Sequence, residues 1–550
     1  MTMLPTVSTT QTQRVFPAAP ASSEAVVPLS LLDATTANFA LTSATWIFES
    51  PTVELSRLLP LLHESLRITL SSYPQLCGQC RAFGSIDGLD PAGDDKIASS
   101  KLAPHTRRFG RVYARFGTDQ DPGVKLITAA SSATVDHLHP ADRVKRLALW
   151  ERSKGPLKAF SPATAIAHAL QPNEPDADGV RKPLLAIQIT ELACRGLVLS
   201  IKCAHPMVDI AALVCFVKDW ASVSRAKLAG EAVPLLRPVF DPALVDVLAA
   251  GDINAEQPDP DIIDRAMKLP MNRFDWWAPS EGCPWPSSVP SVFQDRDLPP
   301  AGLAMPWAEW DVHAPVSSYI VHLSREQVDF LWGRATQAQP AGVRISKHDA
   351  VLAHLWSCVV RARDLEGDHT SPVHCDLVLG LRPPLQLGDT FIGSPVVMVN
   401  VEMAGAQVCD DVGATTRRIR DTIALGGSRD GLAAHLHGVA FEKSPQRIWQ
   451  AFLGRRHLLV TTWARAGIYE VDFGFGSVLR YADGIVPDMD GCVLIKEAPP
   501  ALAAKHGAPS GAKPAWTDSG VDISIALGEE HMQRLLDDPL LLPVMPVNLN

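Results

Sequence analysis

The chain has 550 residues, too many for one ordinary hydrophobic core, and its 46% hydrophobic and 20% charged residues are typical of a globular protein. Its net charge of -10 argues against a general nucleic-acid surface, which needs a basic stripe. Because no uninterrupted apolar stretch reaches the ~18 residues of a membrane span and the N-terminus has no apolar signal region, we expect a cytoplasmic protein without a membrane span.

The residue pattern in the first part of the chain predicts a tail, a helix, a loop-rich insertion and a hairpin. Residues 1–27 are rich in Ser, Thr, Ala and Pro and predict a mobile tail. Residues 55–73 carry leucines at helical spacing and are followed by Pro74, which predicts an amphipathic helix that stops there. The polar, irregular residues 84–118 predict a loop-rich insertion. Two apolar runs in residues 184–203, joined by "ACRG", predict a β-hairpin with Gly196 in its turn.

A polar pair interrupts the apolar stretch "IKCAHPMVDIAA" that follows the hairpin. His205 precedes a proline and should be extended at a strand end, whereas Pro206 is suited to open a helix. Residues 210–228 have helical periodicity, which places Asp209 in the first turn, where the helix dipole favours its charge. The junction therefore predicts an imidazole at a strand end with a carboxylate within one turn of it.

A segment rich in proline and tryptophan, residues 229–310, separates the two halves of the chain. It has little periodicity of either kind, which predicts a crossover between domains. Trp276, Trp277 and Trp285 within it either line an apolar channel or pin the crossover, and we favour pinning.

Strand and helix patterns alternate in the second half. Residues 346–363 predict a helix with Ser346 as its N-cap. Strand-like runs are "SSYIVHLS", "HCDLVLGLRPPL", "SPVVMVNVEM", "RHLLVTTWA", "YEVDFGFG", "GCVLIKE" and "VDISIAL", with a terminal helix at "ALGEEHMQRLLDD" and a solvent loop at residues 498–520. We therefore expect an α/β (α+β) architecture with an N-terminal lobe at residues 28–228 and a C-terminal lobe at residues 311–550.

The ten cysteines are sparse and mostly lie in apolar surroundings, which is typical of reduced core thiols. Cys77 and Cys80 in "CGQC" match the spacing of redox sites, but no second pair at zinc spacing follows. His-x-x-x-Asp supplies only two metal ligands. The sequence therefore predicts no metal site.

Three interpretations of His205 compete: a buried structural histidine, a metal ligand and a general base. A metal-binding role is disfavoured because His-x-x-x-Asp supplies only two ligands. Gly-x-Ser-x-Gly occurs nowhere in the chain, so a hydrolase triad is also disfavoured, and direct proton transfer to a histidine base is the simpler chemistry. The residues of this stretch leave the core histidine and the general base open.

A second stretch carries a resemblance to a known family. "TTWARAGIYEVDFGFG", residues 461–476, resembles the Asp-Phe-Gly-Trp-Gly signature and its upstream Thr-x-Trp-Ala-Arg, and it follows "HPMVD" in the expected order. "SKHDAVLAHLWSCVVRAR" and "LRPPLQLGDTFIGSP" are weaker similarities. With these segments the chain resembles the BAHD acyl-CoA-dependent acyltransferases, in particular their fungal branch near trichothecene 3-O-acetyltransferases. It departs from the usual pattern at Ile210, where Gly is common, and at Phe475, where Trp is common.

The resemblance implies two lobes of the chloramphenicol-acetyltransferase type, each a mixed sheet with flanking helices, with the segment near residues 382–400 packing on the N-terminal lobe. It implies acyl-CoA as co-substrate, no bound cofactor, a small-molecule acceptor and a monomeric protein of secondary metabolism. His205 would take the proton of an acceptor hydroxyl and return it to the CoA thiolate. An amine acceptor and a catalytically inactive binding protein of the same fold are the alternatives. A condensation-type relative is disfavoured by Ala204, where that type has a second histidine.

The resemblance also assigns the remaining site residues. Asp209 would orient His205 by pairing with an arginine, for which Arg361 and Arg363 are candidates. Thr461 and Trp463 would stabilise the oxyanion. The predicted contacts to substrate or CoA are Ser346, Arg382, Asp472, Gly474 and Gly476.

Overall fold

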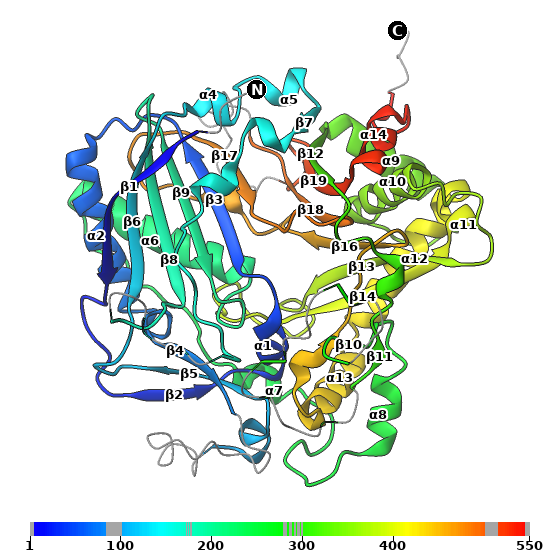
Figure 1. The fold of residues 1–550 in the computed structure, drawn as a ribbon, viewed down its shortest axis with the longest axis horizontal. Helices are drawn as coiled ribbons and strands as arrows, with labels where there is room; N and C mark the ends of the chain where they lie inside the picture. The colour runs from blue at the N-terminus through cyan, green and yellow to red at the C-terminus, as the bar shows by residue number, and fades with distance from the viewer. Residues whose placement is uncertain are drawn as a thin grey trace.

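The computed structural model describes residues 5–83, 102–171, 173, 175, 179–278, 283–284, 289–290, 293, 298, 301–500 and 515–544. Two large mixed sheets lie next to one another with helices packed on them, which confirms the predicted two-lobed class (Figure 1). Trp285, residues 84–101 of the expected insertion and residues 501–514 of the expected loop lie outside the described residues. Within the described part of the chain, no helix has both the length and the apolar character that a membrane span requires.

The first large sheet has the strand order β1-β6-β8-β9-β3-β17. Its strands are β1 (Val7–Val15), β6 (Val124–Ser131), β8 (Leu185–Leu192), β9 (Leu197–Cys203), β3 (Thr42–Phe48) and β17 (Leu479–Gly484). The pair β8–β9 is the predicted antiparallel hairpin, and its residues are almost continuously buried. Two helices, α2 (Leu55–Leu70) and α6 (Ile210–Ala229), pack against each other, and the Trp220 indole donates to Ser65 Oγ at 3.0 Å.

The second large sheet has the order β14-β13-β16-β18-β19-β12-β7. Its strands are β14 (Val396–Ala404), β13 (Pro372–Gly380), β16 (His457–Thr462), β18 (Cys492–Glu497), β19 (Val521–Gly528), β12 (Val316–Leu323) and β7 (Leu149–Glu151). Its longer helices are α9 (Arg325–Gln337), α10 (Lys347–Ala362), α12 (Val412–Gly426) and α14 (Glu529–Asp537). Ser346 caps α10 as predicted, because its hydroxyl accepts from Asp349 N–H while the Asp349 carboxylate accepts from Ser346 N–H.

Smaller elements fill the space beside the two large sheets. One small sheet contains β2 (Ala25–Pro28), β5 (Val112–Phe116) and β4 (Gln79–Ala82), and another contains β11 (Leu303–Ala304), β10 (Phe274–Asp275) and β15 (Ile448–Trp449). The remaining helices are α1 (Leu31–Thr35), α4 (Val135–Leu138), α5 (Arg143–Arg146), α7 (Ala243–Asp246), α8 (Pro260–Ala266), α11 (Gly405–Asp410) and α13 (Arg429–Phe441). Of these elements, α7, α8, β10 and β11 belong to the crossover, residues 229–310. Their short lengths leave most of its described residues irregular.

Three of the local predictions are wrong. The expected tail contains β1, which pairs with β6 over most of its length, because its Ser, Thr and Gln residues suit an edge strand that is open to solvent. The expected insertion contains β5, whose residues are mostly buried. "YEVDFGFG" is not a strand, because Gly474 and Gly476 adopt positive φ angles of 81° and 69° there.

The two large sheets exchange strands across the predicted lobe boundaries. β17 lies in the C-terminal half of the sequence but pairs antiparallel with β3 of the first sheet. Conversely, β7 lies in the N-terminal half but pairs with β12 of the second sheet. Each sheet is therefore completed by the other half of the chain, and neither lobe is a continuous segment.

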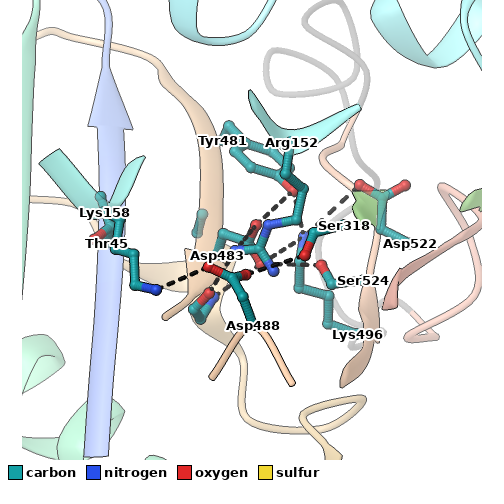
Figure 2. Close-up of polar contacts among 12 residues, drawn as sticks. Thr45, Arg152, Lys158, Ser318, Tyr481, Asp483, Asp488, Lys496, Asp522 and Ser524 are labelled. Carbon is teal, nitrogen blue, oxygen red and sulfur yellow. Dashed lines mark hydrogen bonds and ion pairs between the residues drawn. The ribbon is translucent and has the colours of Figure 1, made fainter. Parts of the chain in front are cut away.

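Buried charges connect the two lobes where these strands meet (Figure 2). Lys496 Nζ of β18 lies 3.9 Å from Asp483 Oδ1 of β17 and 3.7 Å from Asp522 Oδ2 of β19. Arg143 Nη2 donates to the same Asp522 carboxylate at 2.5 Å. Burial raises the pKa of Asp522, but the charges of Arg143 and Lys496 outweigh this and hold it below its ordinary value. Since a buried charge is costly without its partner, separating the lobes at this cluster would be unfavourable.

Candidate active site

His205 lies in the turn between β9 and α6, in the partly buried space where the two lobes meet. Its Nδ1 atom lies 2.9 Å from Ser394 Oγ, and its ring makes an edge-to-face contact with Phe39 at a centroid distance of 5.4 Å. Among the described residues, no hydrogen bond reaches its Nε2 atom. One ring nitrogen is therefore anchored by the protein, while the other has no partner in the described chain.

The helix after His205 begins later than predicted. Pro206 lies in the turn, and α6 begins at Ile210 with Asp209 as its N-cap. The Asp209 Oδ1 atom accepts from Ala212 N–H at 2.9 Å, so the capping carboxylate and not the proline sets the first helical residue.

Arg382 binds the Asp209 carboxylate with two nitrogens. Its Nη2 donates to Asp209 Oδ1 at 2.8 Å, and its Nη1 donates to Oδ2. Nη2 also reaches the carbonyl oxygens of Phe391 at 3.1 Å and Gly393 at 3.2 Å. Asp209 N–H in turn donates to the Gly393 carbonyl at 3.1 Å. The segment from Arg382 to Gly393 is thereby held on the strand-to-helix junction that carries His205.

The arginines first expected to pair with Asp209 lie elsewhere. Arg361 Nη2 donates to Asp538 at 2.7 Å, and Arg363 Nη2 donates to Asp490 at 2.8 Å. Both lie at the end of α10 and pair with carboxylates of their own lobe. Arg382, predicted as a contact to substrate or CoA, is the actual partner, and its guanidinium is occupied by Asp209.

Ser394 and Asp33 are site residues that sequence reasoning missed. Ser394 N–H donates to Asp33 Oδ1 at 2.5 Å, across 361 positions of sequence. Asp33 Oδ2 accepts from Ser30 N–H at 3.0 Å and from Ser30 Oγ at 2.7 Å in the capping box of α1. Burial raises the pKa of Asp33 to about 6, against the hydrogen bonds from Ser30 and Ser394. A short helix from the start of the chain thus fixes the serine that contacts His205.

The surroundings of His205 change its basicity. Burial lowers the pKa of His205 below the ordinary 6.5, and the negative charge of Asp209 opposes this in part. The imidazole is therefore neutral at neutral pH, which is the form that can accept a proton.

Thr461 and Trp463 lie at the end of β16, beside β18. Trp463 N–H donates to the Ile495 carbonyl at 2.8 Å, and the residue is 7% exposed. The ring lies so close to Gly484 that a Cβ there would come within 2.6 Å of Trp463 Cη2. No hydrogen bond among the described residues joins either side chain to His205, so their role at the oxyanion stays a prediction.

The predicted second signature packs on the far end of α6. Arg225 Nη1 donates to the Asp472 carbonyl, and Gly474 N–H donates to Asp472 Oδ1 at 2.8 Å. A Cβ on Gly476 would come within 2.5 Å of Thr52 Oγ1. At a rise of 1.5 Å per residue, Arg225 is about 24 Å along the helix from Asp209. The structure therefore does not bring Asp472, Gly474 and Gly476 to His205, and their contact to CoA stays a prediction.

Two further predictions concern Ser346 and the thiols. Ser346 Oγ accepts from Arg420 Nη2 at 2.8 Å, so its observed contacts are those of a helix cap, and contact with CoA stays a prediction. Cys77 and Cys80 are free thiols, and both are buried. Burial raises the pKa of both thiols, which makes them inert. The described residues contain no group of His, Cys, Asp or Glu side chains suited to a metal ion.

The chain is similar to known acyltransferases over most of its length. A sequence model of the Transferase family matches residues 155–252 and 312–540. Acyltransferase AFT15-1 of Alternaria alternata is 25% identical over 517 residues, which cover 91% of this chain and 90% of that protein. Trichothecene 3-O-acetyltransferase TRI101 of Fusarium sporotrichioides is 21% identical, with 76% of each chain covered.

Solved structures share the fold. The crystal structure of F. graminearum TRI101 complexed with ethyl coenzyme A has a TM-score of 0.63 at 14% identity, covering 94% of this chain and 98% of that one. Vinorine synthase has a TM-score of 0.58 at 15% identity, covering 97% and 98%. Because the family match extends over more than half of its residues, the chain belongs to the Transferase family of BAHD acyltransferases, enzymes that use acyl-CoA as co-substrate.

Proposed function

We propose that this protein transfers an acyl group from acyl-CoA to the hydroxyl of a small-molecule acceptor, with His205 as the general base. The observation that carries the proposal is the anchoring of His205 through Nδ1 by Ser394, while Nε2 has no hydrogen-bond partner among the described residues. A histidine held in one orientation and kept neutral by burial is suited to take a proton. This favours the general base over the buried structural histidine that the sequence left open.

In the proposed reaction both substrates are bound together. His205 Nε2 takes the hydroxyl proton while the acceptor oxygen attacks the thioester carbonyl. The tetrahedral intermediate then collapses with cleavage of the C–S bond, and the imidazolium returns its proton to the CoA thiolate. Thr461 Oγ1 and Trp463 Nε1 are the proposed donors to the oxyanion, a role that commonly supplies a large share of rate acceleration.

Asp209 has a positioning role in this scheme. Its two oxygens bind Arg382, and Oδ1 also accepts from Ala212 N–H. The carboxylate is thus occupied by groups that fix the junction, and its charge acts on His205 only through space. We expect it to set the orientation of the base without taking the proton.

The relatives favour an alcohol as acceptor and keep an amine as the second candidate. Trichothecene 3-O-acetyltransferase is an O-acyltransferase by name, whereas Putrescine hydroxycinnamoyltransferase 1 of Oryza sativa, named for an amine, is 26% identical over 64% of this chain. Thiol release from acetyl-CoA, measured with a panel of alcohols and amines and with mass spectrometry of the products, separates the two. No acylated product with any acceptor or acyl donor would contradict the proposal.

We also propose that the enzyme acts as a cytoplasmic monomer. Free cysteines such as Cys77, Cys80 and Cys203 suit a reducing compartment. Size-exclusion chromatography with light scattering would test the oligomeric state, and a stable dimer would contradict this part of the proposal.

The pH dependence of the reaction should report the lowered pKa of His205. The base is active when neutral, so kcat/KM is expected to decline towards acid pH with a midpoint below 6.5. In Asp209→Asn, any residual activity should decline at a still lower pH, because the charge that raises the pKa of His205 is gone. A pH-rate profile at constant ionic strength measures both, and an inflection of the wild-type enzyme above 6.5 would contradict the assignment.

Ser394→Ala should lower kcat about 2- to 13-fold, which corresponds to the loss of one neutral hydrogen bond of about 0.5–1.5 kcal/mol. The KM for acyl-CoA and the melting temperature should stay near those of the wild type, because only the hydroxyl is removed. Ser394→Thr keeps a hydroxyl and serves as the matched control. An unchanged kcat in Ser394→Ala would show that the contact to Nδ1 does not orient the base.

A further inference from the structure

A row of aromatic side chains begins at His205. Phe39 contacts the imidazole, and Trp449 follows Phe39 at a centroid distance of 5.0 Å in an edge-to-face contact. Trp276 follows Trp449 at 5.6 Å, and Trp307 follows Trp276 at the same distance. The row leads from the base into the crossover between the lobes.

The backbone around these rings is fixed by pairing. Trp449 lies in β15 opposite Phe274 of β10, and Trp276 N–H donates to the Arg447 carbonyl at 2.8 Å. The buried Arg447–Asp275 ion pair, with Nη2 to Oδ2 at 2.5 Å, joins β10 to the residue just before β15. Gln446, just before β15, donates from Nε2 to the Ala34 carbonyl at 3.0 Å in α1, the helix whose Asp33 holds Ser394. The elements that carry the aromatic row are therefore fixed relative to the base.

Exposure changes along the row. Phe39, Trp449 and Trp276 are partly exposed, whereas Trp307 at 5% and Trp310 at 8% are buried in a hydrophobic cluster. We refer to Phe39, Trp449 and Trp276 as the aromatic face. Trp277, at 7% exposed, packs on Phe293 and fits the pinning interpretation, whereas Trp276 is only partly buried. The part of the row nearest the base thus has surface left for a ligand.

We propose that the aromatic face binds the acceptor and selects a flat, apolar ring system that carries the reacting hydroxyl. Aromatic side chains prefer partners whose rings stack with an offset or meet edge to face, which a puckered saturated ring cannot match. We assign the face to the acceptor because Phe39 touches the imidazole that takes the acceptor's proton. The competing occupant is an aromatic acyl group of the donor, which the comparison of benzoyl-CoA with acetyl-CoA separates. The adenine of CoA is not the expected ligand of this face, because the whole pantetheine arm separates the adenine from the thioester that reacts beside His205. The inference rests on the proposed function, because it identifies the bound molecule as the acceptor of the acyl group.

Binding of a matched pair of alcohols tests the inference without requiring turnover. Naphthalenemethanol is flat and aromatic, and decalinmethanol is its saturated analogue with the same carbon skeleton. By isothermal titration calorimetry, wild-type protein should bind naphthalenemethanol about tenfold more tightly, as expected for one or two aromatic contacts. Trp449→Leu should reduce this ratio to near one, and Phe39→Leu provides a second variant if the first fails to fold.

Trp310→Leu is the matched control, because it removes an indole from the buried end of the row and should leave the ratio unchanged. A wild-type ratio near one, or a tenfold ratio retained in Trp449→Leu, overturns the inference. It is also overturned if Trp449→Leu changes the relative KM of benzoyl-CoA and acetyl-CoA, since the face would then belong to the donor. Trp449-dependent binding with no thiol release from either thioester contradicts the proposed function and leaves the aromatic face as a ligand site.

Discussion

Replacing His205 with alanine is expected to lower kcat for acyl transfer about 10²- to 10⁴-fold, the usual effect of losing a general base. The loss should fall on the chemical step, because the imidazole is proposed to act on the acceptor proton and not to bind CoA. Thiol release from acetyl-CoA at saturating acceptor measures kcat, and the KM for acetyl-CoA should change little.

His437 provides the control for this substitution. It is a buried histidine of α13, away from the site, and its Nδ1 lies 2.7 Å from the Ala250 carbonyl. His437→Ala should lower the melting temperature while retaining most of the turnover per folded molecule. If His205→Ala retained near-wild-type turnover, His205 would be a structural histidine and the proposed mechanism would be wrong.

Asp209→Asn should lower the free energy of unfolding by about 3–5 kcal/mol, the usual cost of breaking a buried ion pair by removing one partner. Asp209 is 5% exposed and Arg382 is 9% exposed, so the guanidinium would be left as an uncompensated buried charge. Asparagine is itself a good N-cap, which keeps the start of α6 and confines the change to the lost charge. Denaturant unfolding measures the stability, and acyl transfer should fall strongly in the same variant.

The double variant Asp209→Asn with Arg382→Met separates the buried charge from the catalytic loss. Methionine removes the orphaned cation while keeping an apolar side chain of comparable length, so part of the stability should return. Activity should stay low, since the segment that carries Ser394 would no longer be tied to the junction. If Asp209→Asn were inactive but as stable as the wild type, Asp209 would have a direct chemical role.

Local sequence patterns predicted the elements that carry the base. The β8–β9 hairpin, α6 and the capped α10 follow from periodicity and turn residues, because these signals depend on neighbours in the chain. The sequence also placed His205 and Asp209 at the junction of strand and helix. It misplaced only the first helical residue, because it gave the proline more weight than the capping carboxylate.

The partners of these residues could not be predicted in the same way. Arg382 is 173 positions from Asp209, and Ser394 is 189 positions from His205. Nothing in the local pattern distinguishes Arg382 from Arg361 or Arg363, since all three are arginines near predicted element ends. Only the path of the chain between the sheets decides which guanidinium reaches the carboxylate.

The strand exchange between the lobes has a consequence for synthesis on the ribosome. β3 is synthesised early, but its partner β17, residues 479–484, is synthesised much later. Until that segment emerges, one edge of the first sheet has unpaired backbone groups and can pair with other chains. The nascent protein is thus exposed to aggregation for most of its translation, and its yield should depend on chaperones that cover this edge.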